Sequence, residues 1–140
     1  MNDLMNARRI LDEGGYTCVI CRGSTVHTAT ARGVKPLVNW LDHGLDARDA
    51  CAADKVVGKA TAFLYCLLGV RAVYAHVMSR GAAEVLARAG IGVSHGKLVP
   101  GIINRAGTGP CPFEAAVAQT GTPEEALPVI RRKMAEMNIR

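Results

Sequence analysis

The sequence predicts a single α/β domain whose mixed sheet carries helices on both faces. Residues 70–94 read as strand, helix and strand in succession, which requires a right-handed parallel crossover. Residues 16–30 read as two strands joined by the tight turn Gly23-Ser24. Helical periodicity recurs before, between and after these strands, so helices are available to cover both faces of the sheet.

The N-terminal half supplies the hairpin and two helices. Apolar residues recur at helical spacing in the first segment, and glycines follow the segments where helices should end. The expected elements are a helix that includes Leu4 to Leu11 and ends at Gly14-Gly15, strands at Tyr16–Arg22 and Thr25–Thr30, and a short helix that follows Gly33 and ends before Gly44.

The central part carries the strongest helical stripe, with apolar residues at Val56, Ala60, Phe63, Leu64 and Leu67. This spacing predicts a helix over Lys55–Leu68 that Asp54 caps and Gly69 ends. The elements expected next are a buried strand at Val70–Val77, a helix that Ser79 caps and Gly90 ends, and a strand at Ile91–Ser94.

The C-terminal part reads as a loop followed by two helices. Leu98–Asn104 is ambiguous because Pro100 is a poor residue for a central strand. After the loop Arg105–Pro110 a helix begins at Pro112. The run Thr122-Pro-Glu-Glu125 is a capping box that opens the last helix, in which Pro128 should produce a kink.

Composition limits the function classes. The 140 residues are 49% hydrophobic and 21% charged, as expected of one ordered domain that spans residues 1–140. No apolar run is long enough for a membrane span or a signal peptide, and the five cysteines form no disulfide framework, so we expect a cytoplasmic protein. The net charge of +5 favours an anionic partner. The basic residues are scattered and aromatics are few, so nucleic-acid binding is a weaker interpretation.

The first candidate site is the segment Ala53–Lys59. If a helix starts after Asp54, Gly58 leaves room one turn later, and Lys55 and Lys59 place two positive charges near the positive end of the helix dipole. An anionic ligand would explain this pair of lysines, and Asp54 could act as a general base. The alternative is a simple cap followed by a solvated helix face.

The second candidate site is the run from Asn104 to Glu114. Gly107 and Gly109 allow backbone amides to converge on a phosphate, and a helix follows at once. Cys111 at that helix start could be a nucleophile, or it could be a small buried residue. The ligand-binding candidates are Gly58, Lys59, Asn104, Arg105, Thr108, Gly109 and Glu114, and Glu114 is equally explained as a capping glutamate.

Cysteine and histidine give weaker signals. Cys18 and Cys21 have the spacing of a redox or zinc motif, but residues three apart on a strand face opposite sides. Cys66 is expected to pack inside a helix interface. His76, at the end of a central strand, is the most interesting histidine, although a structural role explains it as well.

Three runs resemble one prokaryotic family, domain of unknown function family 1893, to which a cytidine-deaminase-like fold is assigned. They are Arg32-Gly-Val-Lys-Pro36, Ala52–Leu64 and Ile102–Glu114, in the same order as in that family. The resemblance implies a three-layer sandwich, with a hairpin and parallel strands between helices. It implies no established activity.

The zinc motifs of deaminases are missing at the expected places. Deaminases of this fold have His or Cys followed two residues later by the catalytic Glu, and a Pro-Cys-x-x-Cys after the next strand. In the predicted alignment Ala52 and Asp54 occupy the first pair of positions, and no cysteine pair follows His76. We therefore expect no metal or other cofactor. A ligand set improvised from Asp54, His76 and Cys111 is a minor alternative.

The leading hypothesis is a zinc-free pocket for a small anionic, nucleotide-like molecule between the two candidate segments. If the chain is an enzyme, Asp54, Lys55 and Cys111 are the catalytic candidates. The alternatives are a non-catalytic regulatory or homo-oligomer-forming module, and a weak nucleic-acid binder that uses Arg131–Lys133.

Overall fold

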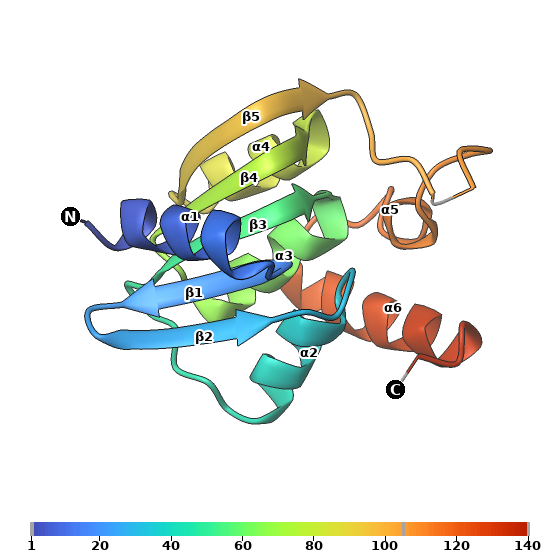
Figure 1. Cartoon of the computed structure of the whole chain (residues 1–140). Coiled ribbons are helices and arrows are strands. Elements are labelled where there is room, and N and C mark those ends of the chain that lie inside the picture. The colour runs from blue at the N-terminus through green and yellow to red at the C-terminus, as the bar shows by residue number, and fades with distance from the viewer. Residues whose placement is uncertain (1, 105, 140) are drawn as a thin grey trace.

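A computed structural model describes residues 2–104 and 106–139, and it contains one mixed five-stranded sheet (Figure 1). The strand order is β2-β1-β3-β4-β5, with β1 antiparallel to both neighbours and β3, β4 and β5 parallel. The strands are β1 (Cys18–Arg22), β2 (Thr25–Ala29), β3 (Cys51–Val57), β4 (Ala72–Ser79) and β5 (Gly92–Val99). The helices are α1 (Asp3–Gly14), α2 (Lys35–Asp42), α3 (Lys59–Leu68), α4 (Arg80–Arg88), α5 (Pro112–Ala116) and α6 (Pro123–Glu136).

The predicted three-layer α/β architecture is confirmed, since helices cover both faces of the sheet (Figure 1). One face is covered by α1, which lies against β1, β3 and β4. Its small core consists of Ala7, Leu11, Val19, Cys21, Ala53 and Tyr74. The other helices build the larger core on the opposite face.

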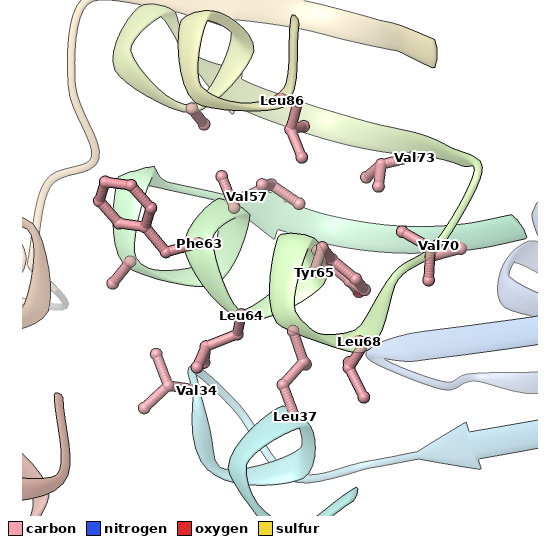
Figure 2. Close-up of a cluster of buried hydrophobic side chains, with 14 of the residues drawn as sticks. Val34, Leu37, Val57, Phe63, Leu64, Tyr65, Leu68, Val70, Val73 and Leu86 are labelled. Carbon is pink, nitrogen blue, oxygen red and sulfur yellow. The ribbon is translucent and has the colours of Figure 1, made fainter. Parts of the chain in front are cut away.

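Helix α3 is the centre of the larger core (Figure 2). Its side chains Phe63, Leu64 and Tyr65 are at most 2% exposed and lie between the sheet and the helices α2 and α4. Burying an apolar side chain of this size stabilises the fold by about 2–3 kcal/mol. The predicted end of this helix is correct, because Gly69 is its C-cap with a φ of 81°.

The predicted start of α3 is wrong, because the residues assigned to its first turn belong to a strand. Residues 51–57 form the central strand β3, and the helix begins at Lys59 with Gly58 as its N-cap. Ala52 and Ala53 lie in the cores on opposite faces, so this strand shows no alternation of apolar and polar residues that could identify it. Asp54 is therefore a strand residue and not a helix cap, and Lys55 does not share a helix with Lys59.

Most other elements lie where they were predicted. Ser79 caps α4 by accepting a hydrogen bond from the backbone N–H of Ala82 at 3.1 Å. Thr122 caps α6, and its hydroxyl donates to the Glu125 carboxylate. Helix α6 continues through Pro128, and β5 extends beyond the predicted strand to Val99.

An irregularity crosses the three parallel strands shortly before their carboxyl ends. Strand pairing omits the row formed by Lys55, His76 and Gly96, while the register is the same on either side of it. The side-chain alternation also changes phase there, since Ala75 and then Met78 face the larger core. Because the register is unchanged, no residue is inserted in one strand relative to its neighbour, and the irregularity redirects the side chains of all three strands together. The carboxyl ends of the strands consequently carry exposed residues that a regular sheet would bury.

Gly96 is required at this irregular row, because a Cβ atom there would lie 2.8 Å from the backbone oxygen of His76. The His76 side chain contacts α1, the helix on the smaller-core face of the sheet: its Nε2 lies 2.9 Å from the Asp12 carboxylate. Since a carboxylate only accepts hydrogen bonds, Nε2 carries a hydrogen, and Nδ1 lies at hydrogen-bond distance, 3.0 Å, from the Tyr74 hydroxyl.

We expect Gly96→Ala to lower the free energy of unfolding by about 1–3 kcal/mol, because the added methyl group collides with backbone. Gly101→Ala is the matched control, since nothing lies within 4 Å of its Cβ position, and it should change stability by less than about 0.5 kcal/mol. Urea denaturation measures both. Equal stability of the two variants would contradict the close approach.

Candidate functional site

The start of α3 receives a carboxylate from a distant part of the chain. The backbone N–H of Ala60 donates a hydrogen bond to Oε2 of Glu114 at 3.2 Å. Glu114 is on the short helix α5, so the two predicted candidate segments do meet. Its side chain therefore caps another helix instead of its own. The N-terminus of a helix favours a negative charge, which explains why a carboxylate lies there.

Gly58 makes this contact possible. A Cβ atom at Gly58 would lie 2.6 Å from the carboxyl carbon of Glu114, which is closer than real Cβ atoms approach. The glycine is buried, and its φ of −96° is open to any residue, so space and not backbone conformation requires it. The interpretation that Gly58 leaves room for a group to approach the backbone agrees with this geometry, and the group is Glu114.

Lys59 is also tied to the segment that carries Glu114. Its Nζ donates to the backbone oxygen of Ala118 at 3.1 Å and lies 5.7 Å from the centre of the Phe63 ring. Helix α5 and the residues just after it are thus attached to the first turn of α3 by two polar contacts, one from Glu114 and one from Ala118. The ammonium group of Lys59 therefore helps to hold this segment against α3.

Further positive charges surround the carboxyl ends of the parallel strands. Lys55 lies near the end of β3, Arg80 is the first residue of α4, and Lys97 lies near the end of β5. All three side chains are exposed. Since β3, β4 and β5 are parallel, their carboxyl ends share one edge of the sheet, and this edge is positively charged.

Asp54 lies in a separate buried polar cluster. Its Oδ2 accepts from the Tyr65 hydroxyl at 2.7 Å, and its Oδ1 accepts from the backbone N–H of Val56 at 3.2 Å. The Tyr65 oxygen also lies 2.9 Å from Sγ of Cys18. Burial raises the pKa of Asp54 to about 6, although these hydrogen bonds oppose the shift. The predicted general base is only 8% exposed, and its carboxylate is bonded to Tyr65 of α3.

The loop between β5 and α5 is bonded to itself. The Oδ1 atom of Asn104 accepts from the backbone N–H of Thr108, and the Asn104 backbone oxygen accepts from the N–H of Gly107. The Asn104 amide also donates to the Thr108 hydroxyl. Two of the amides expected to hold a phosphate thus already have partners. Gly109 is half-buried, and Arg105 lies outside the described residues.

The other predicted site residues are dispersed. Cys111 is the N-cap of α5, partly buried against the larger core. The improvised zinc set is wrong, because Asp54 contacts α3 on one face of the sheet and His76 contacts α1 on the other. Among the residues that the structure describes, no three His, Cys, Asp or Glu side chains are grouped as metal ligands.

Three further expectations can be compared with the geometry. Cys18 and Cys21 lie in the cores on opposite faces of the sheet, as predicted, and Cys66 packs against the larger core. In the basic tail, Arg131 pairs with Asp42 and Lys133 with Glu136. In residues 2–104 and 106–139 no helix has both the length and the apolarity to cross a bilayer.

The deaminase alignment also needs correction. The first core helix starts at Gly58-Lys59-Ala60 and not after Asp54, and the next starts at Ser79-Arg80-Gly81-Ala82. Neither start contains His, Cys or Glu. The carboxylate at the first helix start comes instead from Glu114. Sequence reasoning placed Gly58 and Glu114 at one predicted pocket, but it did not predict that the Glu114 carboxylate itself occupies the space beside Gly58.

The raised pKa of Asp54 predicts how stability depends on pH. Because the pKa is higher in the folded state, the folded state favours the neutral acid, and this contribution is present below about pH 4 and lost as pH rises through about 6. When the pH rises from 4.5 to 7.5, we therefore expect the free energy of unfolding of Asp54→Asn to increase by about 2 kcal/mol relative to that of wild type. Urea denaturation at both pH values measures the gain.

Tyr65→Phe provides the matching variant. It removes the hydroxyl that stabilises the Asp54 carboxylate, so the loss of stability with rising pH should be steeper than in wild type. A difference between Asp54→Asn and wild type that stays constant from pH 4.5 to 7.5 would show that Asp54 does not titrate in this range.

Among the solved structures that match, one is similar over nearly the whole chain. It is a DUF1893 family protein, TM1506, from Thermotoga maritima, which is 26% identical with a TM-score of 0.86; the match covers 94% of this chain and 90% of that one. A diaminohydroxyphosphoribosylaminopyrimidine deaminase/5-amino-6-(5-phosphoribosylamino)uracil reductase from Thermotoga maritima is 14% identical, with a TM-score of 0.44 over 67% of this chain and 35% of that one. RibD from Acinetobacter baumannii is 18% identical, with a TM-score of 0.45 over 66% of this chain and 34% of that one.

A comparison with curated proteins gave no match. The family model described as TM1506, domain of unknown function (DUF1893), matches residues 6–134. Because this match covers most of the chain and includes all three sequence runs, the family resemblance is confirmed. The chain belongs to the DUF1893 family.

Proposed function

We propose that this chain binds a small anionic molecule at the start of α3, where the anionic group of the ligand replaces the Glu114 carboxylate. The observation that carries the proposal is the hydrogen bond from the Ala60 N–H to Glu114 beside Gly58. This helix start binds a carboxylate within the chain, so its geometry and charge suit an anion. Glu114 acts as the internal substitute for the ligand.

The surrounding charge supports an anionic ligand. Lys55, Arg80 and Lys97 are exposed at this edge, whereas Glu114 is committed to Ala60. Positive charge at one edge of a sheet raises the local concentration of anions. Helix α4 begins beside α3, and Gly81 in its first turn lies close to the Lys59 side chain. Two helix starts side by side suit a phosphate ester, such as a nucleotide-like molecule.

The proposal gives this chain a ligand-binding site and assigns it no reaction. Asp54 is buried at Tyr65, and Cys111 caps a different helix. The geometry gives neither residue a contact with Glu114 among the described hydrogen bonds. We therefore assign the site to binding and leave catalysis out of the proposal.

Removing Glu114 should expose the anion site. We expect Glu114→Ala to lose about 1–2 kcal/mol of stability, because the start of α3 loses its carboxylate cap. Inorganic phosphate should then restore about half of this loss by binding at the vacated helix start. Thermal unfolding with and without phosphate measures the effect.

Phosphate also stabilises many proteins non-specifically, so the control needs a similar lesion elsewhere. Glu125→Ala removes a glutamate from the start of α6, where the carboxylate is bonded to Thr122. Phosphate should restore more stability to Glu114→Ala than to Glu125→Ala. If phosphate restored the same stability to both variants, the proposal would be contradicted.

A ligand panel tests the wild-type protein. We expect nucleotides or other phosphate esters to raise its melting temperature, and Lys59→Gln to reduce that rise because a cation beside the helix start is lost. Lys35→Gln is the matched control, since Lys35 is likewise the first residue of a helix, α2. No stabilisation by any phosphate ester would count against a phosphate-bearing ligand.

A further inference from the structure

A cavity of about 150 Å³ opens between α3, α4 and the start of α6, away from the contacts that Glu114 makes. Its floor is formed by Phe63 and Cys66 of α3 and Val85 of α4. At its mouth lie Arg88, Ala89, Gly121 and Pro123. Arg88, Ala89 and Gly121 are exposed, so a molecule from solvent can enter.

The size and the lining fit one ring. An apolar cavity of about 150 Å³ in another protein is large enough to hold benzene. Here the lining consists mainly of an aromatic ring and aliphatic groups, which favour an apolar body. The Cys66 thiol does not change this character, because burial and the nearby Glu124 carboxylate raise its pKa to about 11 and keep it neutral.

Arg88 gives the mouth a charge. Its guanidinium belongs to none of the salt bridges found among residues 2–104 and 106–139. A guanidinium presents several donors in a plane and suits a carboxylate. Glu124 is close enough to Cys66 to raise the pKa of its thiol, and this negative charge should weaken the binding of an anion.

We propose that this cavity binds a small monocarboxylate with a ring-sized apolar body, placing the ring between Phe63 and Val85 and the carboxylate at Arg88. The proposal goes beyond the anion site at the start of α3 and is independent of it. Both sites favour an anion, but for different reasons: the first because of a helix start, and the cavity because of the single arginine Arg88. The apolar body is what distinguishes this ligand class.

Benzoate and benzyl alcohol are suitable probes, because they share the ring and differ in charge. Occupancy can be followed through Cys66, whose alkylation rate by a maleimide is measured by peptide mass spectrometry. We expect benzoate to slow the alkylation of Cys66 saturably, and Ala89→Leu to abolish this protection by filling the mouth. Cys111, outside the cavity, provides the internal reference, and its alkylation rate should not change.

Charge variants decide the ligand class. Arg88→Gln should weaken benzoate binding about fivefold, as expected for loss of a solvent-exposed charge-assisted contact, and leave benzyl alcohol unchanged. Glu124→Gln should strengthen benzoate binding. Equal protection by both probes that is insensitive to Arg88→Gln would overturn the carboxylate class, and no protection by either probe would overturn the site. Neither result bears on Glu114, because Ala60 and Gly58 do not line this cavity.

Discussion

The hydrogen bond between Ala60 and Glu114 is the contact on which the arrangement of the sheet edge depends. It joins residues 54 positions apart in the sequence and attaches α5 to the first turn of α3. The bond from Lys59 to Ala118 reinforces this attachment. From there the chain continues to α6, whose Ala126 and Ile130 are fully buried in the larger core. Without the carboxylate, the start of α3 would present unpaired N–H groups at a positively charged edge.

The two faces of the sheet have different roles around this contact. The face of α2, α3, α4 and α6 holds most of the apolar core, and the Asp54 carboxylate buried there is hydrogen-bonded to Tyr65. The face of α1 carries the polar connection from Asp12 through His76 to Tyr74. The irregular row that contains His76 lies in the sheet, shortly before the exposed carboxyl ends of the parallel strands.

Local signals predicted much of the fold correctly. The ends of α1 and α3 follow from glycines, and the starts of α4 and α6 follow from Ser79 and Thr122, because caps and stops act over one turn. β3 was missed because a central strand with alanines on both faces has no alternation, while Val56 and Ala60 happen to match helical spacing. Asp54 before that stripe then resembled a cap. The pairing of Gly58 with Glu114 could not be predicted, since it depends on how α5 returns to the sheet edge.

The most direct measurement of the central claim is the amide resonance of Ala60 in a 15N–1H NMR titration of the wild-type protein with inorganic phosphate. If phosphate replaces the Glu114 carboxylate, the Ala60 resonance shifts saturably, and the amides of α5 shift with the same dependence on concentration. An Ala60 resonance that stays in place while amides near other exposed basic residues respond would show that the helix start is closed to ligands.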